Sequence, residues 1–219
     1  MPPGPEELTS EDPIARGAAA VALGLNPPLP RGAAALLRDL VDGDADARVR
    51  AGALGALVRA AGSGTARAAW RVGARDRDPA VRRRAAELAP SLGTPAPVRM
   101  VIGLLRDTDP GVAETAAWAL GELGDAARAA GAVPALVAAT GEHPDPLVRE
   151  AAVAALGALG DRRGLPAILD ACRDRPAVRR RAVLALAPFD GPDVDAALAA
   201  ARADPDWQVR QAAEDLSCP

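Results

Sequence analysis

The stretch DPLVREAAVAALGALGD, residues Asp145–Asp161, occurs in variant form along almost the whole chain of 219 residues. The recurring pattern is an Asp and a Pro before a Val-Arg pair, followed by alanines and Leu-Gly, and most copies depart from it at one or more positions. Seven copies are found, and their anchoring residues are Ala15, Val49, Val81, Val112, Val148, Val178 and Val209. The spacings between successive anchors are 34, 32, 31, 36, 30 and 31 residues. This regularity predicts an array of structural repeats.

Each copy has the features of an α-helix. The Asp three residues before the anchor can cap the helix, and the adjacent Pro suits the first helical position. Counted from the anchor as zero, apolar or small residues occupy positions 0, 4, 7, 8 and 11, which form one face of a helix. Gly160 is expected to end the helix of the fifth copy. These helices, the second of each repeat, are predicted to start near residues 13, 47, 79, 110, 146, 176 and 207.

Shorter amphipathic segments between these helices are predicted to be the first helices of the repeats. They are Gly32–Val41, Ala66–Ala74, Ala96–Leu105, Val133–Thr140, Leu165–Cys172 and Asp193–Ala201. No segment shows convincing strand alternation. We therefore predict an all-α fold, a right-handed α-solenoid of HEAT-like or armadillo type with about six to seven helical hairpins. A single repeat domain is expected over residues 11–219, after a flexible N-terminal stub of residues 1–10.

The repeat resembles a known family. The copies DPGVAETAAWALGELGD (Asp109–Asp125) and DPLVREAAVAALGALGD (Asp145–Asp161) are similar to the HEAT-like repeats of the phycobilisome lyase type. The resemblance covers about residues 11–216. It implies an adaptor that binds another protein on its concave face, or a protein that attaches or removes bilin chromophores. Similar helical repeats also occur in deoxyhypusine hydroxylase, which binds two irons through His-Glu pairs, and in a group of DNA glycosylases.

The composition limits the possible partners and compartments. The formal net charge is −3, so the molecule as a whole is not built to attract phosphate. The two cysteines, Cys172 and Cys218, form no CxxC motif and are typical of a reducing compartment. The N-terminus does not resemble a signal peptide, and no apolar stretch is long enough to cross a bilayer. We expect a soluble cytoplasmic protein.

Candidate catalytic and metal-binding residues are few. A di-iron or zinc site needs several His, carboxylate or Cys ligands, but the chain contains one histidine, His143, and no His-Glu pair. Cys172 lies on the apolar side of a short helix and is expected to be buried, whereas Cys218 has no obvious activating partner. His143 takes a loop position that is Asp in other copies, namely Asp44, Asp76, Asp107 and Asp204. We expect no catalytic residue, no metal and no cofactor. The chain is therefore not expected to be an enzyme.

The exposed side of the second helices is the candidate binding surface. Positions 2, 6 and 9 point away from the anchor, and the second helices are expected to line the concave side of the solenoid. Charges of both signs alternate along these positions, which makes nucleic acid an unlikely partner because a phosphate groove needs a continuous basic stripe. The mixed surface suits a protein partner. The predicted partner-binding residues are Arg83, Glu87, Glu114, Trp118, Glu150, Val153, Arg180 and Leu184.

Trp118 is the strongest candidate anchor, because Trp and Arg are enriched at interface hot spots. The alternative interpretation is structural, with the indole covering a neighbouring helix. Trp70 is expected in the core, and Trp207 is expected to pack on the final turn. The predicted function is a non-catalytic scaffold or adaptor. The alternative is a bilin-lyase-like or other chromophore-handling accessory protein, and nucleic-acid binding comes third.

The sequence AVRRRA occurs at Ala80–Ala85 and Ala177–Ala182, and its arginines are expected to have three roles. The first belongs to a column that Ala113 interrupts, and with the loop aspartates it predicts an Asp–Arg ladder between repeats. The second, Arg83 or Arg180, is directed to the binding face, where Glu87 is placed to pair with Arg83. The third, Arg84 or Arg181, is expected to extend outward from the edge of the buried face. The column is Arg16, Arg50, Arg82, Arg149, Arg179 and Arg210.

Overall fold

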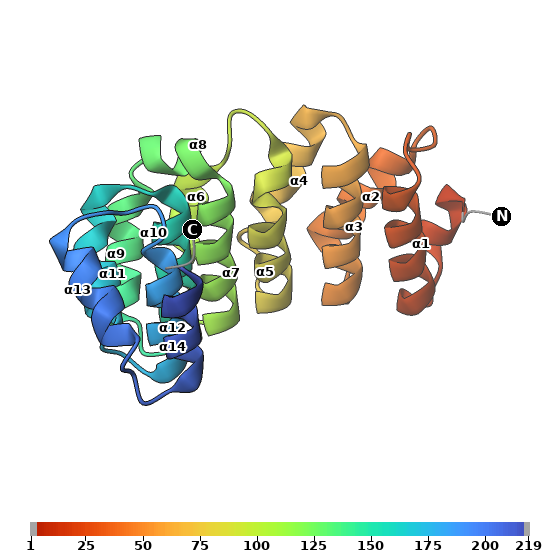
Figure 1. Cartoon of the computed structure of the whole chain (residues 1–219). Helices are drawn as coiled ribbons and strands as arrows, with labels where there is room; N and C mark the ends of the chain where they lie inside the picture. Colours follow the sequence, from red (N-terminus) through yellow and green to blue (C-terminus); the bar gives the residue numbers. More distant parts are fainter. Residues whose placement is uncertain (1–3, 217–219) are drawn as a thin grey trace. The chain divides into compact units, whose positions relative to one another are not determined.

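The structure is a computed structural model that describes residues 4–216. Within that range it contains fourteen α-helices, three short 3-10 helices and no strand, so the predicted all-α class is confirmed. The chain divides into two compact units, Met1–Pro97 (unit 1) and Val98–Pro219 (unit 2). In each unit the second helices of the repeats form one layer and the first helices form another (Figure 1).

Unit 1 contains three second helices. The helix α3 packs against both α1 and α5 in one layer, and α2 and α4 contact each other in the second layer. The bounds are η1 Pro5–Thr9, α1 Pro13–Leu25, α2 Ala33–Gly43, α3 Ala47–Ala60, α4 Ser63–Gly73, α5 Pro79–Leu88 and η2 Ala89–Leu92.

Unit 2 contains four second helices. The helices α7, α10, α12 and α14 pack in sequence order in one layer, and α6, α9, α11 and α13 form the other. The short helix α8 packs against α9 and α10. The bounds are α6 Val98–Leu104, α7 Pro110–Glu122, α8 Gly124–Ala129, α9 Ala132–Glu142, α10 Pro146–Leu159, η3 Arg162–Gly164, α11 Leu165–Ala171, α12 Pro176–Ala185, α13 Pro192–Ala201 and α14 Trp207–Asp215.

Capping residues fix the start of the second helices. The carboxylate of Asp12, for example, accepts a hydrogen bond from the Ile14 N–H at 2.9 Å and so satisfies a first-turn donor of α1. At α12 the corresponding residue is Arg175, whose side chain makes no such bond. The aspartates that cap in this way are Asp12, Asp46, Asp78, Asp109, Asp145 and Asp206.

The structure describes residues 4–10 of the segment that the sequence predicted to be a flexible stub. Residues Pro5–Thr9 form the 3-10 helix η1, which packs against α1 and α2. Its Leu8 is only 2% exposed, because the segment packs against these two helices. Full burial of a leucine contributes about 1.5–3 kcal/mol. The segment therefore covers apolar surface of α1 and α2.

Glycines at position 9 set the close approach of consecutive second helices. A Cβ added to Gly24 would lie 2.6 Å from the Ala56 Cα, and one added to Gly157 would lie 2.7 Å from the Ala185 Cβ. The corresponding distance from Gly121 to the Ala155 Cα is 3.3 Å. In each case the glycine of one repeat meets the position-7 alanine of the next. The Leu-Gly of the repeat is therefore a packing element as well as part of a helix end.

Candidate protein-binding face

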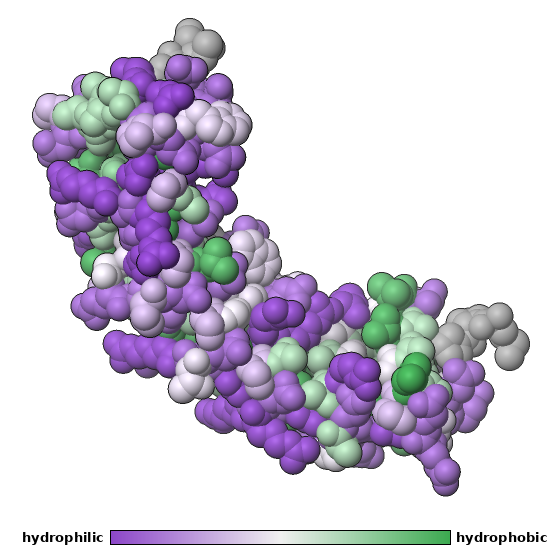
Figure 2. All heavy atoms as spheres, turned by 90° about the horizontal axis from the view of Figure 1, so that it is seen from below, coloured by the Kyte–Doolittle hydropathy of each residue, from purple (hydrophilic) through white to green (hydrophobic). Residues whose placement is uncertain are grey.

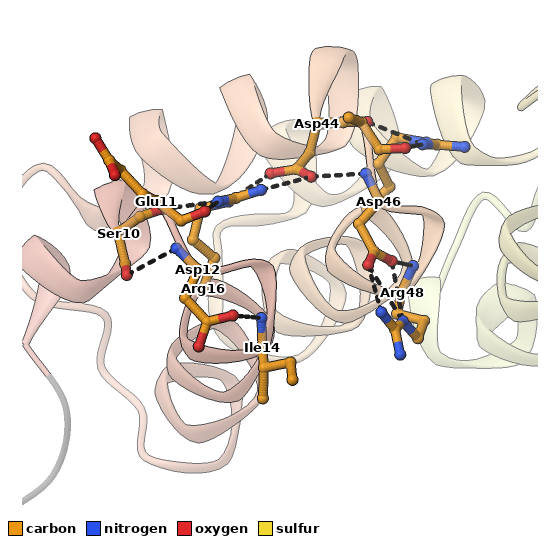
Figure 3. A network of polar contacts seen from close by, with 10 residues as sticks. Ser10, Glu11, Asp12, Ile14, Arg16, Asp44, Asp46 and Arg48 are labelled. Atoms are coloured by element: carbon orange, nitrogen blue, oxygen red, sulfur yellow. Dashed lines mark hydrogen bonds and ion pairs between the residues drawn. The ribbon is translucent and has the colours of Figure 1, made fainter.

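Pairs of Arg and Asp connect consecutive repeats at the loops before the second helices. We call each such pair a rung. In the first rung, Nε and Nη2 of Arg16 donate to the two carboxylate oxygens of Asp44 at 2.7 and 3.1 Å (Figure 3). Its Nη1 donates to the backbone carbonyls of Ser10 and Glu11. Rungs with the same two-pronged geometry are Arg16–Asp44, Arg50–Asp76, Arg149–Asp174 and Arg179–Asp204.

The rung carboxylates also hold their own loops. Besides the Arg16 guanidinium, the Asp46 N–H donates a hydrogen bond to the carboxylate of Asp44, at 2.9 Å. In the same way the Asp78 N–H donates to the carboxylate of Asp76, at 2.8 Å. Burial tends to raise the pKa of Asp44, but the Arg16 guanidinium and the Asp46 N–H lower it further, so the net pKa is below its usual range. The predicted ladder is therefore present within both units, and its arginines stabilise the fold.

One rung is replaced on both sides at once. Ala113 stands where the arginine would be, and His143 stands in the loop that follows. The His143 Nδ1 accepts the Asp145 N–H at 3.1 Å, so the histidine keeps the loop-holding role of the aspartate. In the described part of the chain His143 forms no ion pair of the rung type, because Ala113 stands where the preceding repeat would supply an arginine. His143 is thus a loop residue, and residues 4–216 contain no cluster of three or more His, Cys, Asp or Glu side chains that could hold a metal ion.

In unit 1 the predicted face residues are Arg83 and Glu87 on α5, and both are exposed. The structure corrects their pairing. Glu87 forms an ion pair with Arg84, at 2.7 Å, instead of with Arg83. Arg83 makes no hydrogen bond or ion pair to any residue between 4 and 216, so its charge is available at the surface.

In unit 2 the predicted face residues come from α7, α10 and α12. Trp118 is 46% exposed and Arg180 is exposed, while Glu114 and Leu184 are half-buried. Glu150 is half-buried as well. It reaches Arg181 of the next second helix at 3.4 Å, so its charge is partly neutralised within the unit.

Val153 was predicted in this set, and the structure shows that this prediction is wrong. The side chain is fully buried, at 0% exposure. Position 5 lies on the side of a second helix that packs against the next second helix. For example, Val183 of α12, also at position 5, packs in one apolar cluster with Val209 of α14. The equivalent residues are equally buried, namely Ala20, Leu54, Ala86, Ala117 and Val183.

The other tryptophans divide between core and surface. Trp70 is 1% exposed and its indole N–H donates to the Ala85 carbonyl at 2.6 Å, which confirms its core position. Trp207 is 64% exposed, so the expected packing on the final turn is wrong. It occupies the first position of α14, where its side chain projects outward.

The thiol of Cys172 lies in an apolar environment. Burial raises the pKa of the Cys172 thiol to about 11, so it is protonated near neutral pH. It packs against the apolar cluster that contains Val183 and Val209. Cys218 lies outside the described residues. No helix between residues 4 and 216 combines the length and the apolar composition that crossing a membrane requires.

The comparisons with known proteins match this architecture. A family model described as HEAT repeats matches residues 68–140 and 133–217. The chain belongs to the HEAT-repeat family. The match is to HEAT repeats in general and does not single out the phycobilisome lyase type. The comparison with curated proteins gave no significant match.

Solved structures share the fold of this HEAT-repeat protein at low sequence identity. The Escherichia coli protein YibA has a TM-score of 0.69 and 19% identity, over 98% of this chain and 80% of its own. Kap95p, in a structure concerned with its binding to RanGDP, has a TM-score of 0.58 and 14% identity, over 97% of this chain and 39% of its own. An engineered protein has a TM-score of 0.50 and 22% identity, over 97% and 92%. These likenesses support the α-solenoid fold.

Proposed function

We propose that this HEAT-repeat protein is a non-catalytic cytoplasmic scaffold or adaptor that binds a protein partner through the exposed side of its second helices. In unit 2 this side is the unit 2 face, formed by α7, α10, α12 and α14. Fold alone does not assign a function, so the proposal rests on the surface residues.

The exposed indole of Trp118 carries the proposal. Nearly half of this large apolar side chain contacts solvent, and its ring N–H has no hydrogen-bond partner among residues 4–216. An indole buries a large apolar area on binding and its N–H can find a partner there, which is why Trp is frequent among interface hot spots. The structural alternative, an indole that covers a neighbouring helix, fits Trp70 better because Trp70 is fully buried and hydrogen-bonded.

Charges around Trp118 would set the specificity. Glu114 and Glu122 lie one turn before and after it on α7, and Arg180 projects from α12. The side of the molecule drawn in Figure 2 is mostly hydrophilic, with hydrophobic residues in small separate patches. Recognition by the unit 2 face would depend on Trp118 as an apolar anchor and on charge complementarity around it.

A pull-down with a control variant in the other helix layer tests the proposal. The variant Trp118→Ala with Arg180→Glu removes the anchor and reverses a charge on the same face, whereas Arg173→Glu reverses an exposed charge that follows α11 in the layer of first helices. We expect proteins captured by the native chain and by Arg173→Glu to be lost from the double variant, with thermal unfolding of all three unchanged within a few degrees. Equal capture by the double variant would overturn the proposal. A shift in the absorbance of added bilin would instead support the chromophore-handling alternative.

A further inference from the structure

The exposed side of α1, α3 and α5, the unit 1 face, carries an arginine cluster around Gly55 of α3. A Cβ added to Gly55 would lie 3.0 Å from the Arg84 Nη2 and 3.2 Å from the Arg59 Nη2. Two guanidinium groups from neighbouring helices therefore cover the same buried glycine, because residue 55 has no side chain to exclude them. Other copies have larger residues at this position, such as Val21 and Trp118.

The positive charge of this cluster is only partly neutralised. Arg59 and Arg83 make no hydrogen bond or ion pair with any residue from 4 to 216, and Arg84 has one partner, Glu87, at 2.7 Å. Burial, and after it the charge of Arg84, lower the pKa of the Arg59 guanidinium, which reflects two cations held close together. Arg59 and Arg84 thus share one carboxylate, that of Glu87, and the exposed Arg83 beside Arg84 on α5 adds a third positive charge.

The charge balance of the chain favours a short acidic ligand. Unit 1 contains 13 arginines and 11 Asp or Glu residues, whereas unit 2 contains 13 arginines and 18 Asp or Glu residues. A carboxylate would be drawn to the arginine cluster in unit 1, but a long polyanion would also meet the excess of carboxylates elsewhere in the chain. Exposed apolar side chains of Val21 and Leu25 on α1 give the unit 1 face an apolar part beside the basic one.

We infer that Arg59 and Arg84, whose guanidinium groups meet above Gly55, together with Arg83, which directly precedes Arg84 on α5, form a binding site for the carboxylate side chains of an acidic segment of the partner protein. Planar guanidinium groups bind carboxylates in two-pronged hydrogen bonds, as the rungs of this chain show. An added carboxylate would relieve the repulsion between Arg59 and Arg84. The inference rests on the proposed function and names the chemistry of the partner.

A labelled hexaglutamate peptide titrated into the full chain, followed by fluorescence anisotropy at low ionic strength, tests the inference. We expect saturable binding that weakens as salt is added. Arg59→Gln with Arg83→Gln should lower the affinity at least about tenfold, since each change removes a charge-assisted hydrogen-bond donor group. Arg71→Gln is the matched control, because it removes one exposed arginine of unit 1 from α4 in the other helix layer.

Gly55→Ala tests the geometry without changing any charge. Its Cβ would meet only the mobile ends of the Arg59 and Arg84 side chains, so the chain should fold normally while the two guanidinium groups are pushed apart. We expect weaker peptide binding by this variant at unchanged thermal stability. No binding of the peptide at millimolar concentration, or equal binding by Arg59→Gln/Arg83→Gln and by the native chain, would overturn the inference.

Two further results would assign the site to another occupant. An oligothymidylate that binds the same arginines more tightly than the peptide would indicate nucleic acid. A concentration-dependent dimer in sedimentation that disappears in Arg59→Gln/Arg83→Gln would indicate a second copy of this chain. These results leave the Trp118 experiment untouched, because the variants of the two experiments lie in different units.

Discussion

Replacing Arg50 by methionine would leave a buried carboxylate without its counter-ion in unit 1. In this rung Nε and Nη2 of Arg50 each donate to Asp76 at 2.7 Å, and Nη1 donates to the carbonyls of Asp44 and Ala45 at 2.9 and 3.2 Å. The two side chains are only 5% and 7% exposed. Methionine fills part of the space but offers no donor. Breaking a buried pair from one side costs about 3–5 kcal/mol, and we expect a loss of that size in the free energy of unfolding.

The loss should depend on pH in a defined direction. Burial tends to raise the pKa of Asp76, but the Arg50 guanidinium and the Asp78 N–H together lower it below the value in the unfolded chain. In the native protein this carboxylate therefore contributes stability above about pH 4, which is lost as the pH falls through the folded-state pKa. Without Arg50, burial would raise the pKa above the unfolded value, and protonation would relieve the penalty. The difference in stability between the two proteins should shrink from pH 7 to pH 4.

Urea unfolding followed by tryptophan fluorescence can measure this locally. Trp70 is the only tryptophan of unit 1, so replacing Trp118 and Trp207 by phenylalanine makes the signal specific to that unit. Arg48→Ala is the control, since the Arg48 side chain is 80% exposed and its ion pair should contribute less than about 1 kcal/mol. A loss below about 1 kcal/mol for Arg50→Met, or a loss that stays constant between pH 7 and pH 4, would refute the reasoning.

Two further predictions concern unit 2. Gly157→Ala should destabilise the protein by about 1–3 kcal/mol in urea unfolding, because the new Cβ would overlap backbone atoms of Ala185. The control Gly141→Ala should be neutral or slightly stabilising, because no atom lies within 4 Å of its added Cβ. Similar results for the two variants would contradict the close-packing role of position 9. Ala113→Arg together with His143→Asp should add a rung and raise the unfolding free energy by about 1 kcal/mol, with each single variant less stable than the pair. Thermal unfolding of the four proteins in this cycle would show whether the two positions are coupled.

The repeat made the helix starts and the ladder predictable, since both depend on residues at fixed offsets from the anchor. The ladder prediction missed Asp174 because of its position in the loop. It lies directly before Arg175, the N-cap residue of α12, whereas each of the other rung aspartates lies two residues before the N-cap residue of its own helix. The burial of Val153 was recoverable from the sequence. Position 5 is apolar in every copy except the last, where it is Glu214, which is exposed.

Other features of the candidate site required three-dimensional information. Glu87 is within reach of both Arg83 and Arg84 by helix spacing. The structure shows that the Arg84 side chain lies over Gly55 of α3 and that Glu87 pairs with it there. Gly55 itself carried no signal, because one glycine among many small residues looks ordinary in the sequence. The division into two units is also invisible in a period that continues from Ala15 to Val209.

The replaced rung has a consequence for how folding cooperativity is distributed along the chain. Repeat proteins unfold approximately as linear arrays in which each interface between neighbours has its own coupling energy. The interface between α7 and α10 lacks the Arg–Asp contact, and its glycine, Gly121, approaches the next helix less closely than Gly157 does. The missing Arg–Asp contact and the looser approach at Gly121 both lower the coupling energy between α7 and α10. Native-state hydrogen exchange should therefore reveal a boundary there, with the helices from α10 onward opening as a group that is distinct from α7.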